Sequence, residues 1–175
     1  MSLFTIGHSN HPLEEFVELL RGVGVLIVAD IRRFPASRHC PWFNEDALAA
    51  SLAQSGIGYR RVAELGGRRG RSGIAAEVNG FWENVSFHHY ADYALSPPFR
   101  QGLSQAMTLS DTRPTALMCA EAVWWRCHRR IVADHLLAQD LPVSHIMPDG
   151  RIEPARLTAG AVVGAGAVVT YPARY

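Results

Sequence analysis

The most informative segment for the fold reads Val25-Leu26-Ile27-Val28-Ala29-Asp30. Its first five residues are apolar without interruption, and three of them are β-branched. Such a run is typical of a strand that is covered on both faces, as in a parallel sheet. Asp30 then lies at the carboxyl end of this strand, where a polar side chain can meet a ligand.

Similar apolar runs recur on either side of this segment. They predict further strands at Leu3 to Ile6, Ile57 to Val62, Ala116 to Cys119 and Val143 to Ile146. Helical spacing predicts helices from Pro12 to Gly22, from Asn44 to Ala53, from Pro98 to Leu109 and from Cys127 to Ala138. We expect Asn10 or His11 to cap the first helix and Asn44 to cap the second. The alternation predicts a single-domain α/β fold, with a mostly parallel sheet and helices on both faces.

The 175 residues fit one domain, because a single hydrophobic core is typical of roughly 100–200 residues. We expect residues 1–150 to form the α/β domain. Residues 151–175 are its C-terminal tail or its terminal strands, as a hairpin, a strand added to a neighbour's edge or a loose tail. An aromatic cluster between residues 81 and 93 is expected to pack over the sheet as a less regular insertion.

The charges are nearly balanced, with 17 basic and 16 acidic residues and a formal net charge of +1. The whole chain therefore does not attract nucleic acid electrostatically, and any anion site must be local. One stretch around Gly66, Gly67 and Gly70 is rich in arginine and either contacts phosphate or is a solvated loop. Its arginines are Arg60, Arg61, Arg68, Arg69 and Arg71.

The three cysteines, Cys40, Cys119 and Cys127, are odd in number and have no disulfide-framework spacing. Reduced thiols in a cytoplasmic protein are therefore expected. The first residues do not read as a signal peptide, and the late apolar run from Ala159 to Thr170 is too short to cross a bilayer. No membrane association is predicted.

Several reactive residues fall at the carboxyl ends of predicted strands, where α/β sheets bind ligands. They are His8, Asp30 with Arg32 and Arg33, and Cys119 with Glu121. Glu121 is either a general acid/base or nucleophile, or the ion-pair partner of Arg32, Arg126 or Arg129. Asp30 either binds a ligand or caps the following turn.

Cys127, His128 and Arg129 are predicted in the first turn of a helix, where free backbone N–H groups favour negative charge. A thiol there ionises more readily than a free one, although free cysteines are also often buried and inert. Trp124 and Trp125 precede this turn, and one of them is expected to be exposed near the cleft or to cover the core.

Known local motifs exclude some functions. The chain has no Gly-x-Gly-x-x-Gly and no Gly-Lys-Ser/Thr, so dinucleotide and P-loop sites are not predicted. Cys119 and Arg126 are one residue too far apart for the anion loop of phosphatases and rhodaneses. Cys119, Cys127 and His128, with His8 or Glu121, could bind zinc or iron, but no paired metal-binding spacing is present.

A series of short motifs occurs in the order found in one family. The motifs are Thr5-Ile6-Gly7-His8-Ser9, Asp30-Ile31-Arg32, Phe34-Pro35-x-Ser37-Arg38, Phe43-Asn44, Glu64-Leu65-Gly66-Gly67, Tyr90-Ala91-Asp92-Tyr93, Leu117-Met118-Cys119-Ala120-Glu121, Cys127-His128-Arg129 and His145-Ile146. The chain resembles the family of domain of unknown function 488 (DUF488) from its start to about Gly150. This resemblance implies a shared polar constellation and no settled reaction. Cys40 stands where the family more often has a polar or basic residue, so it is given no site role.

The leading hypothesis is an enzyme of hydrolase or transferase type that acts on an anionic, nucleotide- or nucleic-acid-derived substrate. The candidate catalytic residues are Cys127, Glu121, His128, His8 and Cys119. The candidate substrate-binding residues are Asp30, Arg32, Arg33, Arg129, Ser37, Arg38 and Asn44. No metal site is assigned in this hypothesis, and the sequence identifies no cofactor and no oligomeric state.

Two alternatives stay open. One is a module that binds nucleic acid or a small ligand without catalysis, using the arginine-rich loop and the tryptophans. The other is a metal-binding protein that uses Cys119, Cys127 and His128.

Overall fold

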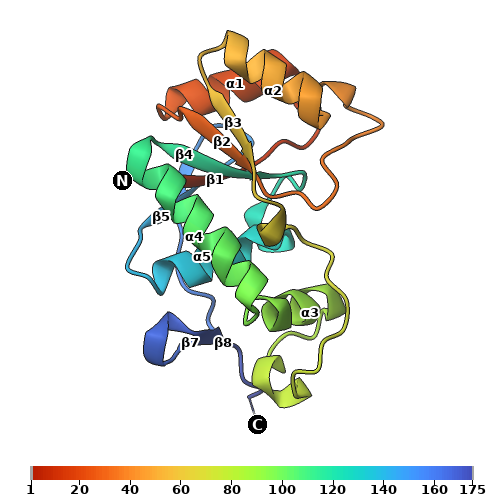
Figure 1. The fold of residues 1–175 in the computed structure, drawn as a ribbon, viewed down its shortest axis with the longest axis vertical. Helices are drawn as coiled ribbons and strands as arrows, with labels where there is room; N and C mark the ends of the chain where they lie inside the picture. The colour runs from red at the N-terminus through yellow and green to blue at the C-terminus, as the bar shows by residue number, and fades with distance from the viewer. Residues whose placement is uncertain (1, 175) are drawn as a thin grey trace.

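A six-stranded sheet organises the chain in the computed structural model, which describes residues 2–174 (Figure 1). Its strands are β1 (Leu3–Gly7), β2 (Ile27–Asp30), β3 (Gly58–Arg61), β4 (Thr115–Cys119), β5 (Val143–Ile146) and β6 (Ile152–Pro154). The helices are α1 (Leu13–Gly22), α2 (Glu45–Gln54), α3 (Val85–Tyr93), α4 (Pro97–Thr112) and α5 (Arg129–Leu137). Short 3₁₀ turns lie at Pro41–Phe43, Ala63–Leu65, Ala76–Asn79, Trp124–Arg126 and Ala165–Ala167.

The strands lie in the order β3-β2-β4-β1-β5-β6, and every neighbouring pair is parallel except β5 with β6. Gly7 of β1 is in register with Cys119 of β4, and Met118 is in register with Asp30 of β2. The chain leaves β2 towards β3 on one side and leaves β4 towards β5 on the other. Connections that diverge in this way open a crevice at the carboxyl ends of the strands.

Each face of the sheet has its own hydrophobic core. On one face, α1 and α2 pack Phe16 and Leu48 against strand residues such as Val28. On the other face, α4 and α5 pack Phe99 and Ile131 against strand residues such as Leu117. The predicted α/β fold with helices on both faces is confirmed, and Figure 1 shows the two helical layers.

Several predicted boundaries and caps were wrong. The strand expected at Val25 begins at Ile27, and the helix expected at Cys127 begins at Arg129. Neither Asn10 nor His11 caps α1, whose N-cap residue is Pro12, because the Pro12 carbonyl accepts the first helical hydrogen bond.

Two further details differ from the predictions in the loops. Asn44 is the N-cap residue of α2 as expected, but its side chain makes no capping hydrogen bond and instead accepts from the Ser37 backbone N–H at 2.7 Å. The insertion expected to be irregular contains α3, which Asn84 caps by accepting from the backbone N–H groups of Ser86 and Phe87.

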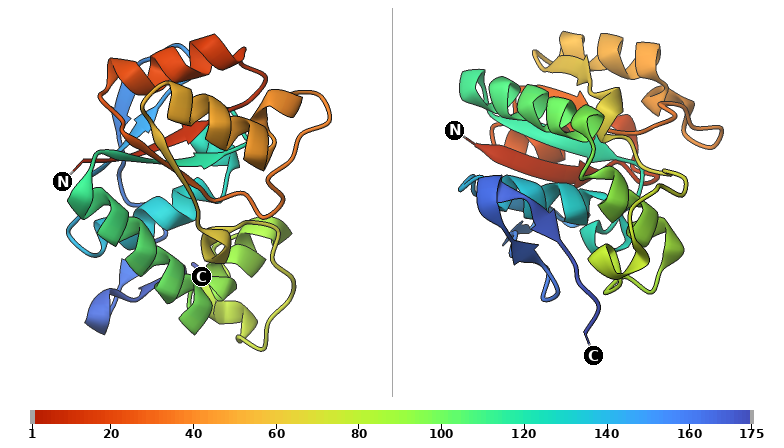
Figure 2. Two further views of the ribbon diagram at one scale, coloured as in Figure 1. Left: turned by 45° about the horizontal axis from the view of Figure 1, so that its top comes forward. Right: turned by 60° about the horizontal axis from the view of Figure 1, so that its bottom comes forward.

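The C-terminal segment packs on the domain in two pieces. β6 adds antiparallel to β5, while β7 (Val162–Val163) and β8 (Val169–Thr170) form a separate hairpin. Tyr171 is buried and donates a 2.8 Å hydrogen bond to Asp134 of α5, whose carboxylate also accepts from the Thr158 backbone N–H. Figure 2 shows the dark blue β7–β8 hairpin on the side of the sheet away from α1.

Within residues 2–174, none of the helices combines the length and the apolar character that crossing a membrane requires.

Candidate functional site

A cavity of about 480 Å³ opens at the carboxyl ends of β2 and β4. Its lining comes from the loop after β2, the arginine-rich loop, the start of α3 and the turn between β4 and α5. We call it the thiol cavity, because Cys119, Cys127 and His128 are among its lining residues. Its volume is in the range of small-molecule sites.

Three of its groups lie close together. The Cys119 sulfur, the Cys127 sulfur and a ring nitrogen of His128 are all within 4.8 Å of one another. Nδ1 of His128 is 3.6 Å from the Cys127 sulfur and 3.8 Å from the Cys119 sulfur. Both cysteines are buried, with 4% exposure for Cys127 and 9% for Cys119. The turn between β4 and α5 therefore presents two thiols and an imidazole to one cavity.

The His128 ring is held in one orientation. Nε2 lies 3.0 Å from the carbonyl oxygen of Ile31 and donates a hydrogen bond to it. Nδ1 faces the two sulfurs. Gly67 makes room for the ring, since a Cβ at that position would lie 2.8 Å from Nδ1.

Arg129 provides the main electrostatic feature. It is only 1% exposed, and its Nε and backbone N–H groups donate to the Cys127 sulfur at 3.3 and 3.4 Å. Its Nη2 donates to the carbonyl oxygen of Glu121 at 2.6 Å. Among residues 2–174, no carboxylate forms an ion pair with it. A buried guanidinium requires a compensating charge, and the Cys127 sulfur is the group placed to supply it as a thiolate.

The two thiols have opposite titration properties. Burial alone raises the pKa of the Cys127 thiol, but hydrogen bonding with Cys119 and the charges of His128 and Arg129 outweigh it and hold that pKa well below its usual range. The hydrogen bond with Cys127, together with burial, raises the pKa of Cys119 well above its usual range. Of the two thiols, Cys127 therefore ionises first, and Cys119 keeps its proton to higher pH.

A glycine of β1 supports this arrangement. A Cβ on Gly7 would lie 1.8 Å from the Glu121 carbonyl oxygen and 2.9 Å from Nη2 of Arg129. The turn after β4 can reach Arg129 only because this position has no side chain. The Glu121 side chain itself is exposed, lines the thiol cavity and forms no ion pair within residues 2–174.

Exposed arginines surround the mouth of the cavity. Arg33, Arg68 and Arg126 line it and are exposed, and Glu121 is the carboxylate among the lining residues. Arg33 donates to the backbone carbonyl of Arg68 at 2.7 Å, and both guanidinium groups lie about 6 Å from the Phe34 ring, at 5.8 and 6.0 Å. The mouth therefore carries an excess of positive charge and favours anions.

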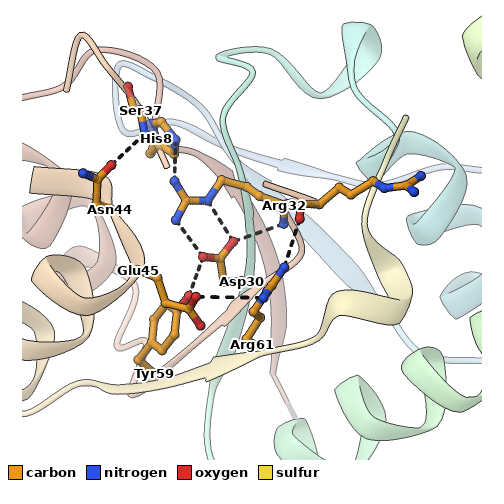
Figure 3. Close-up of polar contacts among 9 residues, drawn as sticks. His8, Asp30, Arg32, Ser37, Asn44, Glu45, Tyr59 and Arg61 are labelled. Carbon is orange, nitrogen blue, oxygen red and sulfur yellow. Dashed lines mark hydrogen bonds and ion pairs between the residues drawn. The ribbon is translucent and has the colours of Figure 1, made fainter. Parts of the chain in front are cut away.

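A second polar cluster lies next to the cavity, around Asp30 (Figure 3). Arg32 donates from Nε and Nη2 to the two Asp30 oxygens at 2.9 and 2.7 Å, and the Tyr59 hydroxyl donates to the same carboxylate at 2.6 Å. His8 accepts from Arg32 at 3.3 Å, and burial lowers the pKa of His8 to about 4. Asp30 and Arg32 thus neutralise each other inside the protein, and Arg32 does not pair with Glu121.

The structure divides the predicted site residues into two groups. Cys119, Glu121, Cys127, His128, Arg32 and Arg33 line the thiol cavity, with Arg129 bonded to the Cys127 sulfur. The remaining candidates, His8, Asp30, Ser37, Arg38 and Asn44, are not among its lining residues. The Ser37 backbone N–H donates to the Asn44 side-chain oxygen, and the Ser37 hydroxyl accepts from the Cys40 backbone N–H at 3.0 Å. Ser37 and Asn44 therefore hold the loop after β2.

Sequence reasoning missed some contributors. The sequence places Arg68 in a basic loop, and it presents Arg126 as a possible ion-pair partner of Glu121 and in the excluded anion loop with Cys119. Neither was among the candidate site residues, yet both line the cavity. No local sequence signal marks Tyr59 as a partner of Asp30. The Gly66-Gly67 motif was the available signal for the close approach of His128.

The tryptophan pair lies outside this cavity. Trp124 stacks on His145 with ring centroids 4.7 Å apart and donates to Glu153 at 3.3 Å, while Trp125 is 43% exposed. One exposed tryptophan was expected, but neither ring lines the thiol cavity.

The two sulfurs and Nδ1 of His128 could supply three ligands to a soft divalent metal, and the Ile31 hydrogen bond orients the ring as such sites require. A cation there would lie beside the buried Arg129 guanidinium, which disfavours it electrostatically. The arrangement fits a thiolate paired with a guanidinium better than a metal.

The family model for the domain of unknown function DUF488 matches residues 12–136. No curated protein and no solved structure matches the chain.

Proposed function

Since the chain belongs to the DUF488 family, whose description assigns no reaction, we propose from the site itself that the protein is a thiol-dependent enzyme for a small anionic substrate. The reaction is of hydrolase or transferase type, and the substrate is nucleotide- or nucleic-acid-derived. One observation carries the proposal: the Cys127 sulfur accepts two hydrogen bonds from the buried Arg129, which has no ion-pair partner within residues 2–174, and lines a cavity with exposed arginines at its mouth.

Cys127 is the nucleophile in this proposal. A thiolate at neutral pH attacks an electrophilic centre and forms a covalent intermediate, which a second nucleophile then resolves. Arg129 and the Cys119 thiol hold the sulfur in its ionised form. Glu121, exposed at the cavity, protonates the leaving group and afterwards deprotonates the incoming water or acceptor.

Anion recognition comes from Arg33, Arg68 and Arg126. Guanidinium groups suit phosphate and carboxylate because they can donate two parallel hydrogen bonds. The exposed Phe34 ring and the Phe87 ring also line the cavity, and they offer apolar surface to a flat group such as a base. This combination supports a nucleotide-like substrate. His8 and Asp30 then act indirectly, by holding Arg32 and the loop after β2.

Two alkylating agents that differ in charge test the proposal without a known substrate. Iodoacetate is anionic and iodoacetamide is neutral, so the ratio of their rates reports the local field at the thiolate. We expect this ratio at Cys127 to exceed that of a free thiol by about tenfold, because a cationic cleft concentrates anions. Replacing Arg68 and Arg126 by Gln should lower the iodoacetate rate and leave the iodoacetamide rate nearly unchanged.

The control is Cys40→Ala, since Cys40 belongs to the core on the opposite face of the sheet. That variant should keep both rates. Equal preference of Cys127 for the two reagents, or no reaction below the pH at which ordinary thiols ionise, would disprove the proposal. Any turnover found in a screen of nucleotides and phosphate esters should be abolished by Cys127→Ser and by Glu121→Gln.

The metal alternative has its own decisive measurement. Elemental analysis of the purified protein reports bound zinc or iron directly. Stoichiometric metal that is lost in Cys127→Ser would replace the thiolate proposal by a metal site. Binding of single-stranded nucleic acid that weakens steeply with salt, without any change to the ligand, would instead favour the binding module.

A further inference from the structure

Cys119 and Cys127 share one cavity but differ in their surroundings. Their sulfur atoms lie within 4.8 Å of each other, and both residues line the thiol cavity. Arg129 donates two hydrogen bonds to the Cys127 sulfur, whereas no arginine donates to the Cys119 sulfur within residues 2–174. A thiolate next to a protonated thiol, both open to the same cavity, is the arrangement in which one sulfur is oxidised and the other resolves it.

We propose that hydroperoxides entering the thiol cavity convert Cys119 and Cys127 into a reversible disulfide that switches the site off. The inference rests on the proposed function, because both require an ionised Cys127. It adds a second class of reactant, a neutral oxidant small enough to reach sulfurs that are almost fully buried.

The oxidation proceeds in two balanced steps. The Cys127 thiolate attacks one peroxide oxygen, the O–O bond breaks, and the alkoxide or hydroxide that leaves takes a proton from solvent. Cys127 is now a sulfenic acid. The Cys119 sulfur then attacks the Cys127 sulfur, the S–O bond breaks, and the departing hydroxyl leaves as water with the Cys119 proton. Two electrons pass from the two thiols to the peroxide.

The backbone around Cys127 permits the sulfurs to approach. Cys119 is the last residue of β4, a central strand, whereas Cys127 lies in extended backbone between a 3₁₀ turn and α5. The preceding residues Trp125 and Arg126 are exposed. Cys127 makes two local backbone hydrogen bonds, from its N–H to the Trp124 carbonyl and from the Arg130 N–H to its own carbonyl, both at 3.1 Å, but none to the sheet. Of the two cysteines, Cys127 can therefore shift without disturbing a strand.

The same arginine makes the disulfide easy to reduce. In the disulfide, Cys127 carries no charge, so the buried Arg129 loses its anionic partner. Stabilising the thiolate stabilises the reduced form of the pair, so the disulfide becomes a stronger oxidant and is reduced more readily. Low-molecular-weight thiols should therefore restore the reduced site, which distinguishes this bond from a structural disulfide.

The third cysteine provides an internal control. Cys40 belongs to the core beneath α1 and α2, whereas Cys119 and Cys127 belong to the core on the other face of the sheet. Cys40 can pair with neither of them inside one molecule. Its own thiol lies away from the thiol cavity.

The test treats the full chain with one equivalent of hydrogen peroxide and maps the cysteines by mass spectrometry. We expect a loss of two hydrogens, located to a peptide that links Cys119 and Cys127, and its reversal by dithiothreitol. In Cys119→Ser, dimedone should instead trap a sulfenic acid on Cys127. Cys40→Ala should oxidise like the unchanged protein.

The outcomes separate the two proposals. A Cys119–Cys127 link in a protein whose Cys127 shows no preference for iodoacetate supports the redox inference and refutes the proposed function. If Cys127 prefers iodoacetate but no Cys119–Cys127 disulfide forms, the redox inference alone is refuted. The same holds if peroxide oxidises Cys127 of the unchanged protein directly to sulfinic acid. Oxidation of Cys40 as fast as Cys127 also overturns it.

Discussion

Replacing Arg129 by Met tests whether this residue keeps Cys127 ionised. Met has a similar length and an apolar body, so it can fill the buried space while removing the charge. In the unchanged protein the Arg129 Nε lies 3.3 Å from the Cys127 sulfur. The variant should therefore raise the pKa of Cys127, because burial, which favours the neutral thiol, is then opposed by fewer groups.

The size of the effect follows from Coulomb's law. Two unit charges about 4 Å apart interact by about 4 kcal/mol at an effective dielectric constant of about 20. Cys119 and His128 remain and retain part of the stabilisation of the thiolate, so we take about half of this value. A loss of about 2 kcal/mol lowers the ratio of thiolate to thiol at a given pH by about thirtyfold.

The assay is titration of the thiolate by its ultraviolet absorbance in a Cys40→Ala background, together with the rate of alkylation by iodoacetamide. The rate should fall less than the population, because a thiolate of higher pKa is intrinsically more nucleophilic. Arg126→Met is the matched control, since Arg126 is exposed and does not bond to the Cys127 sulfur. Its effect on the titration should be small.

Circular dichroism shows whether Arg129→Met is folded, and Arg129→Lys, which keeps the charge, provides a second variant. Lys should preserve more of the thiolate than Met does. If folded Arg129→Met titrates like the unchanged protein, Cys127 is not the counter-ion of Arg129 and the electrostatic argument for the site fails.

Three further predictions concern the supports of the site and the core. Gly67→Ala should lower the free energy of unfolding by about 1–3 kcal/mol and slow alkylation of Cys127, because the added Cβ displaces the His128 ring. Gly70→Ala is the control: Gly70 has open space around it, so the substitution should be almost neutral in urea unfolding. Asp30→Asn should lower the free energy of unfolding by about 3–5 kcal/mol, because it leaves the buried Arg32 without its carboxylate. Glu45→Gln, which removes a half-exposed 3.9 Å pair with Arg61, should lower it by less than about 1 kcal/mol. Equal losses would contradict the assignment of Asp30 as a structural counter-ion. Burial lowers the pKa of His135 to about 4, below its unfolded value, so the unfolded chain binds the proton first as the pH falls. About 3 kcal/mol of stability is therefore lost between about pH 6.5 and about pH 4. His135→Leu should reduce this acid sensitivity and also remove a buried ring nitrogen that has no hydrogen-bond partner within residues 2–174, which urea unfolding at several pH values would show or refute.

The fold could be predicted from local sequence because its main signals are local. Strands buried on both faces need uninterrupted apolar residues, and the helices between them need one apolar side, so the pattern around Val25 to Asp30 and around Ala116 to Cys119 already indicates a covered parallel sheet. Errors appeared at element ends, such as the start of α5, where hydrogen bonding and not hydrophobicity decides which residue begins a helix.

The candidate site could be located from sequence only in part. The rule that ligands bind at strand ends grouped Cys119 with Asp30, and the helix start added Cys127 and His128. The rule could not tell that Asp30 would pair with Arg32, two residues away, instead of a ligand. That outcome depends on the burial of both residues and on the Tyr59 hydroxyl, which β3 brings to the same carboxylate.

The sequence by itself therefore determined the fold class, the edge of the sheet where polar residues collect and the candidate reactive side chains. The tertiary structure alone decided the surroundings of each candidate. It buried Arg129 without a carboxylate partner from residues 2–174 and placed the Cys127 sulfur against it, while Asp30 paired with Arg32. The physical reason is that the charge state of a buried group depends on its burial and on the few atoms within about 4 Å. Arg129 and Cys127 are only two residues apart in the chain, but their burial depends on distant segments, such as β1, where Gly7 leaves room for Arg129.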